Sequence, residues 1–155
     1  MPVTKVREFL DRNNVRYVTI THSPAHTAQT IAASAHVSGR ELAKSVMLKA
    51  DGKMIMAVVP AVNLVDVEML REALGVEQVE LATEREFRDL FPDCELGAMP
   101  PFGGLYGLPV YVADVLTEQE SIAFNAGNFR ELIRLSMRDY ERLAGAKTLH
   151  FAAAV

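Results

Sequence analysis

One lysine in an otherwise apolar stretch is the first residue whose position could serve chemistry. Residues 42–50 read LAKSVMLKA, and as a strand they place Lys44 on one face together with Leu42 and Val46. An ammonium group on such a face needs a partner or a wet cleft, because burying the charge alone is costly. Lys44 is therefore a candidate for holding a ligand, although most lysines are solvated surface residues.

A loop rich in glycine and proline is the second candidate. Residues 97–104 read GAMPPFGG, and this composition excludes a helix or a central strand. Gly97 and Gly103 have no side chain, so backbone N–H and C=O groups there can approach a ligand closely. Most loops of this kind are only turns, so the composition alone does not indicate a site.

A β-hairpin is predicted to position Lys44. The Asp-Gly pair at 51–52 suits a two-residue type I′ turn, because both residues tolerate the positive φ that this turn requires. The returning run at 54–59, MIMAVV, is apolar on both faces, which indicates interior strands. If both strands close directly on this turn, Lys44 lies opposite Val59.

The other segments predict helices and strands in alternation. Helices are expected after N-cap residues at Thr4, Asp66, Thr83 and Ser136, and over residues 27–36. Strands are expected over residues 15–20, 76–81, 109–113, 121–124 and 131–135. Leu90 is expected to face inward with Phe87 and Phe91. Because hairpins and helices are interleaved, the predicted fold class is α/β, a single compact domain over residues 1–155 with a mixed sheet.

The composition is that of a soluble globular protein. Half of the 155 residues are hydrophobic and 23% are charged. The net charge of −4 argues against general nucleic-acid coating, without excluding a local basic stripe such as the arginines at 130, 134, 138 and 142. No apolar run approaches bilayer length, and the N-terminus does not resemble a signal peptide. We expect a cytoplasmic protein without a membrane partner.

Cysteine and histidine patterns disfavour other site chemistries. The single cysteine, Cys94, excludes an internal disulfide, and nothing near it in sequence would depress its pKa. His22, His26 and His36 cluster, but no Cys or carboxylate completes a known metal-ligand spacing. We therefore expect no metal and no cofactor. No Gly-x-Ser-x-Gly segment occurs, so a serine-hydrolase elbow is not predicted.

Five motifs occur in an order that resembles one known family. They are Thr-Ala-Gln-Thr at 27–30, Leu-Ala-Lys-Ser-Val at 42–46, Asp-Gly at 51–52 with Val-Val-Pro at 58–60, Gly-x-x-x-Pro at 97–101 followed by Phe-Gly, and Asn-Ala-Gly at 125–127 ahead of a Leu-Ser-capped terminal helix. This set is similar to the YbaK/EbsC family of aminoacyl-tRNA editing domains, which also occur inserted in bacterial prolyl-tRNA synthetases. The resemblance extends from about Phe9 to Gly145.

The resemblance implies a fold, an activity and partners. The fold would be a compact α/β domain with a largely antiparallel, barrel-like mixed sheet and flanking helices. The activity would be hydrolysis, in trans, of the ester that joins a wrong amino acid to tRNA, typically tRNA(Pro). The expected partners are the acceptor end of mischarged tRNA and, as a further candidate, a prolyl-tRNA synthetase. DNA is not an expected partner.

The resemblance also implies site residues. The invariant lysine of the family falls on Lys44 and its glycine loop on residues 97–101, so the predicted catalytic residues are Lys44, Gly97 and Pro101. The residues expected to bind substrate are His26, Ala28, Ile31, Gly103, Asn125 and Gly127. An aminoacyl ester is already activated, so the protein need only hold the ester and a water in attack geometry. Family members remove different amino acids, and this choice does not carry over.

Two other functions stay open. The chain could be a non-catalytic module of the same fold that binds tRNA or a nucleotide. Catalysis in the family depends on few characteristic side chains, so the sequence separates active from inactive members poorly. It could also be a small-molecule hydrolase of aminoacyl esters, which would turn over substrate without tRNA.

The arginines at 130, 134, 138 and 142 form an arginine row with four-residue spacing. This row either contacts tRNA or forms a solvated face paired with neighbouring acidic residues.

Overall fold

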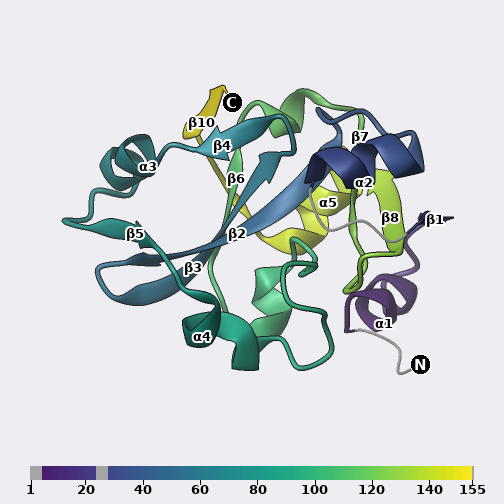
Figure 1. Ribbon diagram of the computed structural model, residues 1–155, viewed down its shortest axis with the longest axis horizontal. Coiled ribbons are helices and arrows are strands. Elements are labelled where there is room, and N and C mark those ends of the chain that lie inside the picture. The colour runs from purple at the N-terminus through teal and green to yellow at the C-terminus, as the bar shows by residue number, and fades with distance from the viewer. Residues whose placement is uncertain (1–4, 24–27, 155) are drawn as a thin grey trace.

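The computed structural model describes residues 5–23 and 28–154, and Figure 1 shows how its elements are arranged. The α-helices are α1 (Lys5–Arg12), α2 (Ala28–Ala35), α3 (Val67–Leu74), α4 (Glu84–Phe87) and α5 (Met137–Ala144). Short 3-10 helices are η1 (Arg88–Leu90), η2 (Gly103–Tyr106) and η3 (Leu116–Glu118). The strands are β1 (Val18–Thr21), β2 (Leu42–Ala50), β3 (Lys53–Pro60), β4 (Asn63–Val65), β5 (Val79–Leu81), β6 (Val110–Ala113), β7 (Ser121–Asn125), β8 (Glu131–Ser136), β9 (Lys147–Leu149) and β10 (Ala152–Ala154). No helix in this part of the chain is long and apolar enough to cross a membrane.

Strands of the described residues form one eight-stranded sheet and one separate pair. Along the sheet the order is β1, β8, β7, β2, β3, β6 and β9, and β5 pairs with β2 beside this path. β2 is parallel to β7, β3 to β6 and β6 to β9, whereas the other neighbours are antiparallel. β10 pairs with β4 outside this sheet. The predicted α/β class with a mixed sheet is thereby confirmed.

Three apolar clusters hold the helices against the strands. The central core lies under α1, α4 and α5, and its members include Leu10, Ala43, Phe87, Met99, Phe102, Phe124 and Tyr140. The α3 cluster includes Leu48, Val59, Leu70 and Phe151. The α2 cluster consists of Ile31, Val37, Leu42, Ala61, Ala123 and Leu132, with Phe129 packed against it. Successive residues of β2 therefore enter different clusters, as the two-residue period of a strand requires.

The β2–β3 hairpin has the predicted turn and register. Asp51 and Gly52 have φ values of 48° and 79°, both positive as the type I′ turn requires. Lys44 lies opposite Val59, which confirms the predicted pairing. The Asp51 carboxylate also accepts a hydrogen bond at 2.9 Å from the N–H of Gln78, just before β5. The turn is therefore tied to the segment before β5, and the register of the hairpin places Lys44.

Three of the predicted N-caps are confirmed. The Asp66 carboxylate accepts a hydrogen bond at 3.0 Å from an N–H in the first turn of α3. The Ser136 hydroxyl does the same for α5 at 3.1 Å. Thr83 and Glu86 form the predicted capping box of α4. Each cap satisfies a backbone donor that its helix leaves unpaired.

Some predicted boundaries differ from the structure. The strands β4, β9 and β10 were not predicted, because three residues are too few to show an alternation pattern. α4 ends at Phe87 and continues as η1, so the α-helical spacing that grouped Leu90 with Phe87 and Phe91 does not apply. Leu90 is 37% exposed, and its predicted inward position is wrong. Thr4, the predicted cap of α1, lies outside the described residues.

A buried tyrosine joins α5 to the glycine-proline loop. Tyr140 is fully buried, and its hydroxyl donates a hydrogen bond to the Pro101 carbonyl at 2.9 Å. Its ring meets that of Phe102 edge to face, with centroids 5.2 Å apart. Burial raises the pKa of Tyr140, so the hydroxyl remains a donor at neutral pH. This contact fixes the side of the loop that faces the core.

We expect Gly52→Ala to destabilise the protein by about 1 kcal/mol, since a left-handed alanine costs roughly 1–2 kcal/mol and the stiffer unfolded chain offsets part of that. A Cβ at this position would touch nothing, so the loss reports backbone conformation alone. Urea denaturation measures it. Gly104→Ala is the matched control, because its Cβ also meets open space and its φ is not positive. Equal losses in the two variants would contradict this explanation.

Removing the Tyr140 hydroxyl should lower the free energy of unfolding by about 1–2 kcal/mol, because the buried Pro101 carbonyl would lose its donor. The variant Tyr140→Phe is compared in thermal and urea unfolding with Tyr17→Phe. The Tyr17 hydroxyl bonds Asp11 at 2.7 Å near the surface, and its removal should cost less than about 0.5 kcal/mol. If both variants unfold alike, the Tyr140 contact does not stabilise the loop.

Candidate functional site

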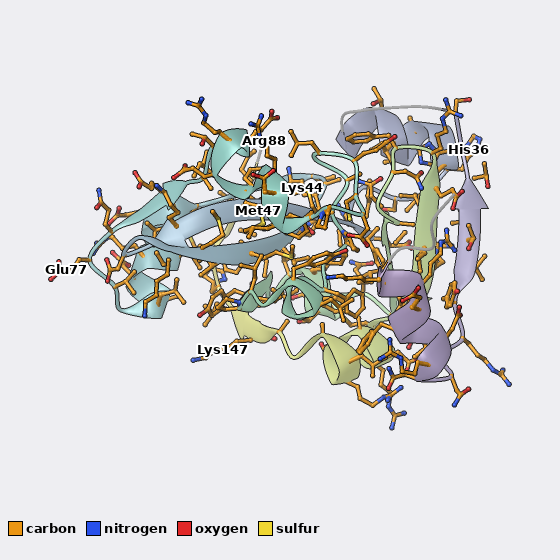
Figure 2. All side chains as sticks on the ribbon, turned by 90° about the horizontal axis from the view of Figure 1, so that it is seen from below. His36, Lys44, Met47, Glu77, Arg88 and Lys147 are labelled. Atoms are coloured by element: carbon orange, nitrogen blue, oxygen red, sulfur yellow. The ribbon has the colours of Figure 1, made fainter. Side chains whose placement is uncertain are left out.

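Lys44 is a half-buried cation without a charged partner. It lies on the face of β2 that carries Leu42 of the α2 cluster and Val46, which packs against the α3 cluster. No hydrogen bond or ion pair joins its amine to another described residue, and burial lowers its pKa. Lys49, further along β2, instead pairs with two glutamates. Figure 2 shows Lys44 near the middle of the molecule in that view.

The glycine-proline loop is fastened to the end of β7. The Gly127 N–H donates to the Ala98 carbonyl at 3.1 Å, and the Gly127 carbonyl accepts from the Glu95 N–H at 2.7 Å. Gly127 has a φ of 95°, which glycine adopts at little cost. The Glu95 carboxylate accepts a further bond at 2.9 Å from the N–H of Phe129. The start of the loop is therefore held in place by the residues that follow β7.

Gly97 brings the loop to the α2 cluster. Its φ is 91°, and a Cβ there would lie 3.2 Å from the ring of Phe129. Phe129 packs against the α2 cluster, which contains Ile31 of α2 and Leu42 of β2. Leu42 shares its strand face with Lys44, so the loop, α2 and the Lys44 face of β2 converge on the same cluster.

Asn125 and Gly127 lie between Lys44 and the loop. β2 and β7 are parallel neighbours, and Ala43 is level with Phe124 in their register. Lys44 and Asn125 are the next residues of the two strands, and Gly127 carries the bonds to the loop. The predicted residues that the fold brings to one region are Lys44, Gly97, Ile31, Asn125 and Gly127.

Two predicted residues lie on the core side of the loop instead. A Cβ on Gly103 would lie 2.9 Å from Val110 and 3.3 Å from Met56. Met56 belongs to the central core, on the face of β3 opposite to Val59. The Cβ direction of Gly103 thus faces the core, where packing leaves no room for a side chain. Its role in substrate binding stays a prediction. Pro101 is also buried, with its carbonyl bonded to α5.

Two predicted residues remain, and a histidine close to them in the sequence, His22, is buried. His26 lies outside the described residues, and Ala28 is the first residue of α2. His22 is only 8% exposed. Its N–H donates to the Arg130 carbonyl at 2.8 Å, and its Nδ1 lies 2.7 Å from the Ser23 carbonyl. In the sequence it was grouped with His26 and His36 as a candidate metal ligand and set aside, and nothing in the spacing indicated its burial.

The thiol of Cys94 lies in surroundings that do not depress its pKa, as the sequence indicated. Burial raises the pKa of Cys94 to about 12, so the thiol stays protonated at neutral pH. Its sulfur lies 3.4 Å from the hydroxyl of Tyr106, which donates to the Asp93 carboxylate at 2.8 Å. Within residues 5–23 and 28–154, no three His, Cys, Asp or Glu side chains are grouped so as to hold a metal ion.

The arginine row does not form one continuous face. Arg134 lies in β8 and pairs with Glu41 at 2.6 Å. Arg142 lies in α5 and pairs with Asp139 at 3.0 Å. Arg142 therefore matches the solvated, paired alternative, whereas Arg134 pairs with an acidic residue that is distant in the chain.

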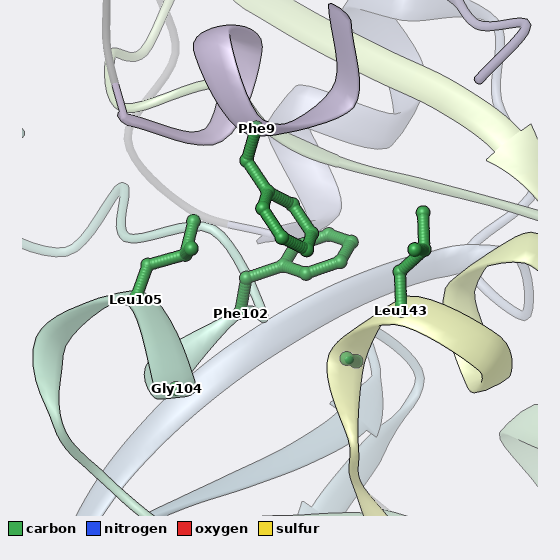
Figure 3. Close-up of a pocket in the computed structure, with 6 residues that line it drawn as sticks. Phe9, Phe102, Gly104, Leu105 and Leu143 are labelled. Carbon is green, nitrogen blue, oxygen red and sulfur yellow. The ribbon is translucent and has the colours of Figure 1, made fainter. Parts of the chain in front are cut away.

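An apolar cavity lies on another part of the surface. It has a volume of about 260 Å³ and lies between α1, η2 and α5, where its lining includes Phe9, Phe102, Leu105 and Leu143 (Figure 3). These side chains belong to the central core or pack against it. None of the side chains that line this cavity is ionisable. A second cavity, of about 410 Å³, is lined by residues that include Arg40 and Glu118.

Comparison with known proteins places the chain in a family. The family model described as aminoacyl-tRNA editing domain matches residues 22–143. Among curated proteins, no significant sequence match is found. One similar solved structure is a hypothetical protein, with a TM-score of 0.81 and 22% identity over 96% of this chain and 99% of that one. Another is a candidate trans-editing enzyme for prolyl tRNA synthetase, with a TM-score of 0.80 and 22% identity over 96% and 95%.

A further similar structure belongs to a larger protein. It is a candidate signal transduction protein from Marinobacter aquaeolei, with a TM-score of 0.76 and 21% identity over 99% of this chain and 31% of that one. At such identities these structures show the shared fold alone. The family model, in contrast, matches most of the sequence, and the chain therefore belongs to the aminoacyl-tRNA editing domain family.

Proposed function

We propose that this protein is a trans-acting deacylase that hydrolyses the ester of mischarged tRNA. The observation that carries the proposal is the unpaired, half-buried amine of Lys44, whose strand face shares the α2 cluster with the Gly97 loop. A cation held beside an accessible stretch of backbone suits a ligand that bears phosphate and carbonyl oxygens. The terminal nucleotide of an aminoacyl-tRNA has both.

The proposed chemistry needs no covalent nucleophile from the protein. An aminoacyl ester is activated, so water can attack its carbonyl directly once both are held in attack geometry. Lys44 would donate a charge-assisted hydrogen bond to the ester carbonyl or the terminal phosphate, which stabilises the negative charge that develops.

The loop would orient the water and the terminal ribose. Gly97 is exposed and has no side chain, which gives a ligand access to the backbone there. The bonds from Gly127 hold this backbone still, and Tyr140 holds Pro101 from the core side. In this proposal Gly97 contacts the substrate, whereas Pro101 is a positioning residue.

The α2 cluster is the proposed wall of the amino-acid pocket. Ile31 and Leu42 are each 2% exposed, and Ala123 is fully buried. For two substrates that differ by one methylene, a wall of this kind changes the binding free energy by only about 1–3 kcal/mol. Selection among small amino acids by this wall alone would therefore be modest.

tRNA(Pro) is the proposed carrier of the ester, and a prolyl-tRNA synthetase is a further proposed partner. The motif resemblance supports this, as does the similar structure described as a candidate trans-editing enzyme for prolyl tRNA synthetase. Because the net charge of the chain is −4, its affinity for tRNA should be modest and should fall steeply with salt.

Lys44→Ala should reduce deacylation of every hydrolysed substrate by about 100-fold or more, because the developing oxyanion loses its charged donor. Turnover is measured against a panel of mischarged tRNAs and corrected for spontaneous hydrolysis. The control is Lys53→Ala, which removes an exposed lysine at the start of β3 and should leave turnover unchanged.

Three outcomes of this assay would count against the proposal. Unchanged turnover in Lys44→Ala would refute the role of that amine. Binding of uncharged tRNA by the wild-type protein without hydrolysis of any ester would favour the non-catalytic module. Turnover of free aminoacyl esters at the rate seen with tRNA would favour the small-molecule hydrolase.

Lys44→Met should abolish activity while leaving the protein at least as stable as the wild type at pH 7. Burial lowers the pKa of Lys44, which means that folding disfavours its charged form. This penalty is present in full below the lowered pKa and disappears as the pH rises from there past 10.5, the ordinary value. The advantage of the variant in urea unfolding should therefore shrink between pH 7 and pH 10. An advantage that grows with pH would be inconsistent with a buried amine.

A further inference from the structure

The Asn125 amide has a buried acceptor that the protein itself leaves unpaired. Its side-chain oxygen has no hydrogen-bond partner among the described residues. Buried polar atoms in native proteins are nearly always paired, so an exception needs an explanation. Ser45 also has an unpaired buried oxygen, but the alternation of β2 places Ser45 on the face opposite to Lys44.

The position of Asn125 relates it directly to Lys44. In β7, Ala123 belongs to the α2 cluster and Phe124 to the central core, so alternation places Asn125 on the α2-cluster side. The parallel pairing of β2 and β7 ends at Ala43 and Phe124, and Lys44 and Asn125 come next. Neighbouring strands lie about 4.8 Å apart. A hydrogen-bond acceptor and a cationic donor therefore face the same region from adjacent strands.

This pair of groups complements the two polar atoms next to the scissile bond of an aminoacyl ester. The ester carbonyl oxygen accepts hydrogen bonds, and the α-amino nitrogen donates them. Only the carbonyl carbon and the α-carbon separate the two atoms, so they lie within the reach of groups on neighbouring strands. Lys44, which is only a donor, matches the carbonyl, and the Asn125 oxygen matches the amino group.

We propose that Asn125 accepts a hydrogen bond from the α-amino group of the substrate, and that the site thereby selects esters of amino acids over esters of other carboxylic acids. This inference rests on the proposed deacylase function and names the substrate feature that the site reads. It also explains the unpaired oxygen: substrate supplies the donor that the fold does not.

The test uses minihelix RNAs charged with alanine or with propionate, which has the same carbon skeleton without the amino group. Serine with 3-hydroxypropionate and cysteine with 3-mercaptopropionate extend the series. After division by the spontaneous rates, the wild type should prefer the amino-acid ester by about tenfold or more. Asn125→Ala should reduce that preference to within about threefold by slowing the amino-acid ester alone.

Two controls separate substrate recognition from stability. Ser45→Ala removes the other unpaired buried oxygen on the opposite face of β2, and it should leave the preference unchanged. Asn125→Ala should unfold at the same temperature as the wild type or higher, because no protein donor is lost.

A binding assay keeps this inference separable from the proposed function. Minihelices that carry alanine or propionate through an amide resist hydrolysis, so their Kd values report recognition alone. A tenfold tighter Kd for alanine that Asn125→Ala removes would support the inference even if no ester were hydrolysed. Equal Kd values and equal rates for the two acyl groups would overturn it while leaving a measured deacylase activity intact. A variant that slows both esters equally would also overturn it, since it would point to the terminal ribose or to the fold.

Discussion

A positive charge held between two apolar clusters is the constraint on which the rest of this structure depends. Lys44 lies on a strand face that is otherwise covered by the α2 and α3 clusters, and its amine has no counter-charge among the residues that the structure describes. Such an arrangement costs stability, so it persists only where neighbouring elements are held firmly. The turn at 51–52 is hydrogen-bonded to the segment before β5, and these bonds restrain one end of the hairpin that carries Lys44.

The glycine-proline loop supplies the opposing half of the site and is restrained at two points. Gly127 bonds its first residues, and Tyr140 bonds Pro101 on the side that faces the core. Backbone held in this way before a ligand arrives does not have to be ordered on binding, which is the advantage of a preorganised site. The same bonds explain why residues so far apart in the chain meet at the α2 cluster.

Local rules predicted the elements better than the contacts between them. Asp51-Gly52 determined the hairpin and the register of Lys44, and Asp66 and Ser136 marked helix starts, because each of these acts through its immediate neighbours. The family pattern identified the loop but not its two sides, so the packing of Gly103 against the core could not be predicted from it. Which side of a loop faces a ligand depends on long-range contacts, such as that of Gly97 with Phe129, which no spacing in the sequence reveals.

The two-residue turn between β2 and β3 also limits how this chain can change length. Side chains alternate along a strand, so gaining or losing one residue at 51–52 would shift the pairing by one position and exchange the two faces. If β2 were the strand that moved, the amine would turn toward the central core, and Ser45 would take its place after a gain of one residue or Ala43 after a loss. The length of this turn therefore sets the direction of an ammonium group that lies seven residues away along β2.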